Sequence, residues 1–371
     1  MRRKLLSLLK KFLNMYPYNL LELDTTTPNE PDARILIIYT GGTFGMGVDK
    51  QGSLKPIDFS KILHEIPSLK SFNLIIKVLA FIKPVDSSDI NPGHWIEMGQ
   101  IIKHYYNNFD GFVILHGTDT MAYSSSALSF MLENLTKPVI FTGAQLPVTE
   151  PRTDAGDNLV TAIEIASKRN KNGKPVVSEV CIYFNHHLIR GNRAQKVESM
   201  HFDAFESANY PPLAIAGVEI DYNYQYIKSF GGEGTLGVAG KLDGNVTFLK
   251  LFPGISENVV KSMLINTDLK GVVLETFGSG NAPMDRWFLR AVSEAVSNGL
   301  FIYNVSQCLG GKVIQGQYET SMALKDAGVI SGKDITSEAA ITKMMYLFGM
   351  EKRMDSIRKK LELSLKGELS E

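Results

Sequence analysis

From Ala33 onward, short continuous runs of apolar residues alternate with segments of helical periodicity, and this rhythm constrains the fold more than any other feature. Runs of this kind, rich in β-branched residues, are typical of strands buried on both faces of a parallel sheet. We predict such strands over residues 34–39, 74–82, 111–115, 138–142 and 180–184. Helices are predicted around residues 95–105, 121–132 and 158–166. The pattern predicts an open, mostly parallel α/β sheet with right-handed crossovers.

A second, smaller alternating unit follows toward the C-terminus. Its predicted strands are 246–251, 271–274 and 300–305, and its predicted helices are 258–265, 285–297 and 337–348. The interval 209–243 contains Pro-Pro and Gly-Gly pairs, loses the rhythm and predicts an interdomain connection. We therefore expect an N-terminal extension over 1–30, a catalytic α/β domain over 31–228, a linker over 229–243 and a smaller α/β domain over 244–371. The sizes of the two expected domains agree with the usual roughly 100 to 200 residues per domain.

Composition narrows the choice of partners. Lys plus Arg equals Asp plus Glu at 39 each, which gives no reason to expect nucleic acid or an acidic membrane as partner. Cys181 and Cys308 lie far from any Cys-x-x-Cys spacing, so we expect no zinc or redox site, and a reducing compartment. The first 30 residues are basic and amphipathic, with a short helix expected before Pro17. No stretch has the roughly 18 apolar residues of a spanning helix, so we expect a soluble protein that binds a small molecule.

Chemically useful residues follow two of the predicted strands. Parallel sheets bind ligands beyond the carboxyl ends of their strands, and residues 40–43 (Thr-Gly-Gly-Thr) stand there. A phosphate-binding loop is disfavoured, because the Gly-x-Gly-x-x-Gly register and a following Gly-Lys-Ser/Thr are both missing, and a hinged lid fits better. Residues 116–120 (His-Gly-Thr-Asp-Thr) follow another strand. Helix capping could explain part of this motif, whereas a hydroxyl beside a carboxylate also suits an ammonium group and a proton relay. We interpret His116 as a structural residue.

Two further clusters are weaker signals by themselves. Residues 86–89 (Asp-Ser-Ser-Asp) could be a capped turn before a helix. Residues 190–196 (Arg-Gly-Asn-Arg-Ala-Gln-Lys) could be a solvated basic turn. A lysine in such a turn becomes useful when partly buried, because desolvation lowers its pKa and lets it take a proton from a hydroxyl.

Together these motifs resemble the bacterial-type L-asparaginase family, in particular its cytoplasmic type I branch. The resemblance runs from about Ile35 to Glu368. The motif at 116–123 is highly specific, and residues 40–46, 142–145, 190–193, 278–283 and 337–340 also match. The resemblance implies an L-asparagine amidohydrolase that needs no metal or cofactor.

The site residues that the resemblance implies fall into two groups. Thr43 matches the nucleophile, which forms a covalent β-aspartyl ester before water releases aspartate. Thr118, Asp119 and Lys196 match the second threonine and its charge partners. The implied substrate-binding residues are Gly42, Asp86, Ser87, Ser88, Thr118, Asp119 and Asn281. Backbone amides of the glycine-rich turn are candidate donors for the oxyanion, and the base is either the Thr118 group or a tyrosine beside Thr43.

The chain departs from the family pattern in two places. The lid tyrosine found in many relatives is missing, because residues 51–54 read Gln-Gly-Ser-Leu. Tyr318 matches the place from which some cytoplasmic relatives supply this tyrosine, and packing at an interface is the alternative role. Gln195 and Glu275 stand where the regulated relatives carry a threonine and an arginine for a separate asparagine site. Glu275 reverses the charge that would hold a carboxylate, so cooperativity by that route is disfavoured.

Assembly and competing functions complete the expectations. The family forms dimers, often paired into tetramers, in which the loop of Gly280 and Asn281 reaches a neighbour's active site. Cys308 matches a residue of the regulatory site, and a small buried apolar residue is the simpler interpretation. Competing functions are a mixed glutaminase-asparaginase, an amidotransferase subunit, for which about 30 preceding residues are too few, and a non-catalytic amino-acid-binding module.

Overall fold

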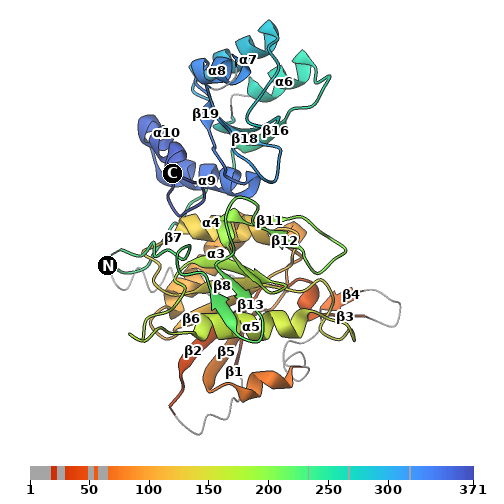
Figure 1. Ribbon diagram of the computed structural model, residues 1–371, viewed down its shortest axis with the longest axis vertical. Coiled ribbons are helices and arrows are strands. Elements are labelled where there is room, and N and C mark those ends of the chain that lie inside the picture. The colour runs from red at the N-terminus through yellow and green to blue at the C-terminus, as the bar shows by residue number, and fades with distance from the viewer. Residues whose placement is uncertain are drawn as a thin grey trace.

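The computed structural model describes residues 18–22, 30–48, 54–56, 66–232, 234–265, 268–316 and 319–371. Over these residues the chain forms two α/β domains, each built on its own sheet (Figure 1). The larger N-terminal domain, coloured red to green, lies below the smaller C-terminal domain, coloured mainly cyan to blue. The predicted fold class of two α/β domains is confirmed.

Nine strands form the main sheet of the larger domain, in the order β1-β5-β2-β6-β8-β9-β10-β13-β14. The five strands β5, β2, β6, β8 and β9 are parallel, and their bounds are Leu74–Phe81, Ala33–Tyr39, Gly111–Leu115, Val139–Thr142 and Val180–Phe184. Each lies within one residue of its predicted range. The prediction succeeds because a strand covered on both faces has to be apolar along its whole length.

Helices cover both faces of this sheet. They are α3 (Pro92–Tyr105), α4 (Met121–Met131) and α5 (Ala155–Ser167). Strand β2 shows how its side chains divide between the two layers. Ile35 and Ile37 pack in the core with α5, whereas Leu36 and Ile38 pack in the core with α3 and α4. The sheet is therefore the middle layer of three.

The sheet edges differ from the expectations. Tyr18–Glu22, within the expected N-terminal extension, forms β1 and pairs antiparallel with β5. Within the irregular interval 209–243, Ala214–Ala216 (β13) and Ile220–Tyr222 (β14) extend the opposite edge beyond β10 (His187–Arg190). These edge strands are short and antiparallel, need no helical crossover and lack the long apolar run that marks a central strand. The predicted helix before Pro17 lies outside the described residues.

Short elements complete the larger domain. Its 3₁₀ turns are η1 (Thr43–Gly45), η2 (Pro67–Ser71), η3 (Ser87–Asp89) and η4 (Gly191–Arg193). Three two-stranded ribbons are β3 (Met46–Val48) with β4 (Leu54–Pro56), β7 (Leu132–Glu133) with β15 (Gly237–Val238), and β11 (Gln195–Lys196) with β12 (Phe205–Glu206). The β7–β15 pair ties the segment that leads to the second domain back onto the first.

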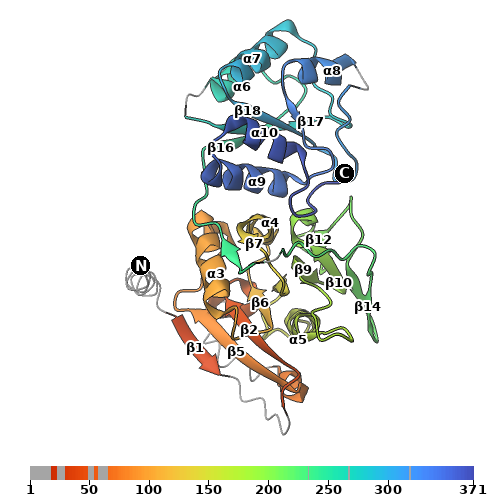
Figure 2. The same ribbon diagram turned by 90° about the vertical axis from the view of Figure 1, so that its left-hand side faces the viewer.

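The smaller domain has a four-stranded parallel sheet in the order β16-β17-β18-β19. Its strands are Val246–Lys250, Gly271–Thr276, Phe301–Ser306 and Ile330–Ser331. Its helices are α6 (Glu257–Leu264), α7 (Arg286–Ser297), α8 (Glu319–Asp326), α9 (Ser337–Met350) and α10 (Met354–Glu362). Helix α9 lies between the C-terminal sheet and α4 of the larger domain (Figure 2), and the Phe130 and Tyr346 rings stack across that junction with centroids 6.2 Å apart.

Candidate active site

The turns after β2 and β6 pack against each other through glycines. Gly42 has a φ of +89°, and a Cβ on it would lie 2.5 Å from the Cα and N of Gly117. Thr43 follows Gly42 in the chain, and Thr118 follows Gly117. The absence of two side chains therefore brings the turns that carry both predicted threonines into direct contact.

Backbone hydrogen bonds hold the same turns together. The Thr40 amide and hydroxyl both donate to the Leu115 carbonyl, at 3.0 Å and 2.9 Å. The Val85 amide donates to the Thr40 carbonyl at 2.7 Å, which links the segment after β5 to the same place. The carboxyl ends of three neighbouring strands thus form one connected rim, as expected for a ligand site on a parallel sheet.

Lys196 connects two of the predicted residues. Its Nζ donates to Thr118 Oγ1 at 2.7 Å and to Asp119 Oδ1 at 2.6 Å. The Lys196 side chain is 16% exposed, whereas the Asp119 side chain is 67% exposed. The lysine is thus mostly enclosed, while the carboxylate faces solvent.

Gln145 completes this group, and the sequence analysis did not assign it to the site. Thr118 Oγ1 donates to Gln145 Oε1 at 3.2 Å, and the Gln145 side-chain nitrogen donates to the His201 carbonyl. The Asp154 carboxylate accepts the Gln145 backbone N–H and holds its loop. Gln145 follows β8, the strand beside β6, so the rule that parallel strand ends meet could have placed it here.

The turn of residues 86–89 lies against the same rim. Asp86 Oδ1 accepts from the backbone N–H and the hydroxyl of Ser88, at 2.9 Å and 2.8 Å. Asp86 and Ser88 are exposed, whereas Ser87 is buried, and its carbonyl accepts the Thr120 hydroxyl at 2.6 Å. The capped-turn interpretation is therefore correct for Asp86. Capping does not explain Thr120, because α4 has no side-chain cap and the Thr120 hydroxyl ties the two turns together.

The structure overturns one interpretation of residues 190–196. We considered a solvated basic turn, but Arg190 and Arg193 are 1% and 3% exposed. The Arg190 guanidinium pairs with Glu179 at 2.5 Å, and Arg193 pairs with Asp334 of the C-terminal domain at 2.9 Å. Arg193 Nε also donates to the Gly367 carbonyl at 2.7 Å. Through these bonds, the turn that precedes Lys196 is attached to both domains.

The other predicted residues that the structure describes lie elsewhere. Tyr318 is outside the described residues. Asn281 follows β17 in the C-terminal domain and forms an isolated antiparallel bridge with Phe277, so it lies in the other domain from the threonines. Glu275 accepts from the Ser337 hydroxyl at 2.6 Å and lies 3.6 Å from Lys250. Cys308 is exposed, which corrects our interpretation of it as a small buried residue.

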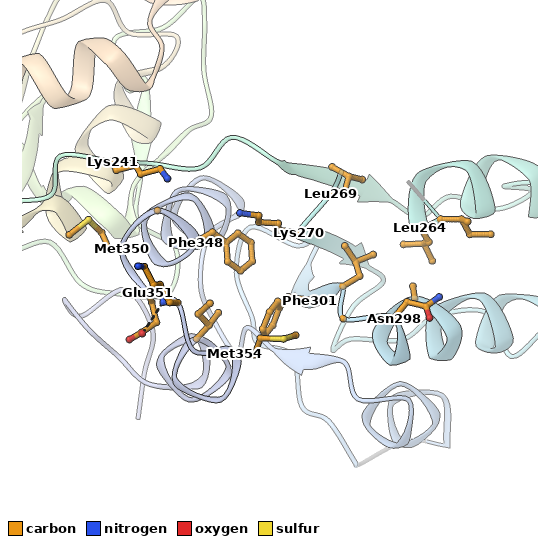
Figure 3. A pocket seen from close by; sticks show the side chains of 17 residues that line it. Lys241, Leu264, Leu269, Lys270, Asn298, Phe301, Phe348, Met350, Glu351 and Met354 are labelled. Atoms are coloured by element: carbon orange, nitrogen blue, oxygen red, sulfur yellow. Dashed lines mark hydrogen bonds between the residues drawn. The ribbon is translucent and has the colours of Figure 1, made fainter. Parts of the chain in front are cut away.

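A large cavity elsewhere has no hydroxyl side chain among its described lining residues. A cavity of about 700 Å³ lies in the C-terminal domain, near the starts of β17 and β18 and the junction of α9 and α10 (Figure 3). Its lining is mainly apolar and includes Phe301, Phe348 and Met354, with lysine side chains among them. None of the described residues that line it is a threonine. Size alone therefore does not identify the active site of this chain.

In the part of the chain that the structure describes, no group of three or more His, Cys, Asp or Glu side chains is placed to hold a metal ion. No described helix is both long and apolar enough to cross a membrane.

Comparisons with known proteins agree with this geometry. Residues 34–228 match the family model described as "Asparaginase, N-terminal", and residues 245–361 match "Glutaminase/Asparaginase C-terminal domain". L-asparaginase 1 of Escherichia coli is 40% identical over 343 residues, covering 91% of this chain and 98% of the relative. L-asparaginase of Thermococcus kodakarensis is 35% identical over 339 residues, covering 91% of this chain and 99% of the relative. The crystal structure of L-asparaginase I from Vibrio cholerae superposes with a TM-score of 0.82 at 37% identity, covering 91% of this chain and 99% of that one. These matches confirm the resemblance drawn from the motifs, and the chain belongs to the asparaginase family.

Proposed function

We propose that the chain hydrolyses L-asparagine to L-aspartate and ammonia through a covalent acyl-threonine intermediate. The observation that carries this proposal is the group of Thr118, Asp119 and Lys196, packed through the contact of Gly42 with Gly117 against the turn of Thr43. A hydroxyl, a carboxylate and an ammonium beside a second hydroxyl suit amide hydrolysis. The similarity to proteins named L-asparaginase supports the same activity.

In the proposed first step, Thr43 Oγ1 attacks the carbon of the substrate's side-chain amide. The hydroxyl proton passes to a base and then to the leaving nitrogen, so that ammonia departs and a β-aspartyl ester remains on Thr43. Water then attacks the ester carbon, the bond to Thr43 breaks, and the threonine oxygen regains a proton. Aspartate leaves, and the enzyme returns to its starting state.

Charge on the substrate oxygen needs a donor in both steps. The Gly117 carbonyl accepts from the buried His116 ring at 2.6 Å. In a planar trans peptide the carbonyl and the following N–H point in opposite directions. The Thr118 N–H therefore points away from His116, and we assign it as a donor to the developing oxyanion.

The exposed carboxylates have a different task in this proposal. Asp119 and Asp86 bind the α-ammonium group of the substrate, while Ser87, Ser88 and the backbone at Gly42 position its α-carboxylate. Asp119 is suited to the ammonium because two thirds of its side chain faces solvent. The turn of Asp86 and Ser88 is held next to it by the bond from Thr120 to Ser87.

We further propose that the protein works as a homodimer, which can pair into a tetramer, in the cytoplasm. Asn281 lies in the C-terminal domain, after β17, rather than with the threonines, so a neighbouring subunit would supply it to the site. Both cysteines are free, which fits a reducing compartment. A change of oligomeric state with concentration, accompanied by loss of activity on dilution, would support this arrangement.

The test is ammonia release from asparagine and from glutamine by the wild-type protein, by Thr43→Ala and by Thr43→Ser. We expect rapid release from asparagine, almost none with Thr43→Ala, and partial activity with Thr43→Ser, which keeps a hydroxyl. Comparable rates on glutamine would establish the mixed-specificity alternative, because one methylene is worth only about 1 to 3 kcal/mol in a pocket. Substrate binding without ammonia release would establish the binding module instead.

A further inference from the structure

A buried chain of three side chains ends at the backbone that carries Thr118. Trp95 Nε1 lies 2.8 Å from Ser124 Oγ, and Ser124 Oγ lies 2.9 Å from His116 Nε2. His116 Nδ1 lies 2.6 Å from the Gly117 carbonyl oxygen. Trp95, Ser124 and His116 are 5%, 0% and 1% exposed, so water does not compete for these bonds.

The direction of every bond in this chain follows from the chemistry of its two ends. A carbonyl oxygen only accepts, so His116 Nδ1 carries the ring proton and Nε2 is the acceptor. The Ser124 hydroxyl therefore donates to His116, and its oxygen accepts from Trp95, whose indole N–H only donates. Each polar group has a partner, and the chain runs one way, from the indole to the Gly117 carbonyl.

This arrangement excludes His116 as the general base. Burial lowers the pKa of His116 to about 4, against a smaller opposite effect of its bond to Gly117, so the ring is neutral near neutral pH. Both ring nitrogens are occupied by fixed partners. The histidine has no free lone pair with which to take a proton from a substrate or a water molecule.

The end of the chain lies where the turns of the site meet. A Cβ on Gly117 would lie 2.7 Å from the Ser87 side chain, and a Cβ on Gly143 would lie 2.4 Å from the His116 carbonyl. Gly42, next to Thr43, also contacts the Gly117 backbone. A rotation of the peptide between Gly117 and Thr118 would therefore disturb several turns at once.

We propose that Trp95, Ser124 and His116 are positioning residues for catalysis, which hold the peptide between Gly117 and Thr118 so that the Thr118 N–H faces the substrate oxygen. This inference rests on the proposed function and adds three buried residues that do not touch the substrate. Their effect falls on the transition state, because the oxygen gains negative charge only during the reaction.

The test replaces Ser124 by alanine, which removes one oxygen atom and breaks the chain at its middle. We expect kcat to fall about 10- to 100-fold while KM changes less than about threefold, since a misoriented donor weakens binding of the oxyanion more than that of the amide. The matched control is Ser129→Ala on the same helix. Among the described residues, the Ser129 hydroxyl bonds only to the Ser125 carbonyl of α4, at 2.8 Å, and Ser129 is also buried.

A second measurement separates positioning from ordinary packing. The ¹⁵N shifts of the His116 ring in wild type should report a neutral Nδ1–H tautomer from pH 5 to 8. Ser124→Ala should change the Nε2 shift, because the variant removes the hydroxyl that donates to Nε2. If Ser124→Ala keeps its kcat within twofold, or if Ser129→Ala loses as much activity, the positioning role is refuted. A wild-type protein without asparaginase activity would overturn the proposed function, whereas the ring shifts would still decide whether the chain of bonds exists.

Discussion

Gly42→Ala tests the packing that brings the two threonine turns together. The residue has a φ of +89°, and left-handed backbone costs a non-glycine residue roughly 1 to 2 kcal/mol. The added Cβ would lie 2.5 Å from two Gly117 backbone atoms, and an ordinary contact needs 3.4 Å or more. The two turns must therefore separate by about 1 Å, and a displacement of that size costs on the order of 100-fold in rate.

The expected cost in stability is smaller than the stability of the fold. Backbone strain and overpacking together cost about 2 to 5 kcal/mol, whereas folded domains are stable by roughly 5 to 15 kcal/mol. The variant should therefore fold and lose about 100-fold in kcat for ammonia release. Its thermal unfolding midpoint, measured on the same preparation, shows how much of the loss comes from unfolding.

Gly173→Ala is the matched control for this experiment. Gly173 has a φ of +72°, and a Cβ there would meet no atom within 4 Å. Gly173→Ala therefore has the free-energy cost of an alanine in a left-handed backbone, but its Cβ meets no neighbouring atom. We expect a small loss of stability and unchanged kcat. If Gly42→Ala keeps kcat within threefold of wild type while folded, the close contact of the turns does not position the threonines.

The other predictions concern the base, the pH dependence and the buried charges. Lys196→Met and Tyr318→Phe separate the two candidate bases in initial-rate assays. Replacing the residue that acts as the base should lower kcat by about 10²- to 10⁴-fold. A loss below tenfold in both variants would contradict both assignments. At Glu97, burial raises the pKa from 4.5 to about 7, so the folded state retains a proton that the unfolded chain loses. The free energy of unfolding should therefore fall as pH rises from about 4.5 to 7, by up to about 3 kcal/mol. Glu97→Gln should flatten this slope in urea titrations, and an unchanged slope would rule out Glu97 as its source. Arg190→Met leaves the Glu179 carboxylate buried without its ion-pair partner and should lower the free energy of unfolding in urea by about 3 to 5 kcal/mol. Adding Glu179→Leu should restore most of this loss. A loss below 1 kcal/mol in the single variant would contradict the reasoning.

Much of the fold was readable from the sequence, because central strands carry a local signal. Residues such as Ile35 to Ile38 face helices on both sides of the sheet, so the strand has to be apolar throughout. The motifs containing Thr43 and Thr118 stood directly after such strands, and parallel strands bring those ends together. The sequence therefore predicted the two α/β domains and the edge of the sheet at which the candidate site lies.

Other features depended on partners far away in the chain. Arg190 and Arg193 had the sequence pattern of a solvated turn, yet both are buried, because Glu179 and Asp334 neutralise them and Gly367 accepts from Arg193. The edge strand Tyr18–Glu22 forms because β5 offers it unpaired backbone groups rather than because of its own apolar pattern.

In the candidate site, too, the sequence predicted some features and tertiary contacts decided others. Its residue types and their order could be predicted from the sequence, because the hydroxyls, the carboxylates and the lysine stand in recognisable motifs. Their arrangement was decided by tertiary contacts: Gly42 packs on Gly117, Lys196 reaches Thr118, and the hydroxyl of Thr118 finds Gln145. Such contacts join residues tens of positions apart, and a hydrogen bond or a glycine contact leaves no periodic trace in the sequence.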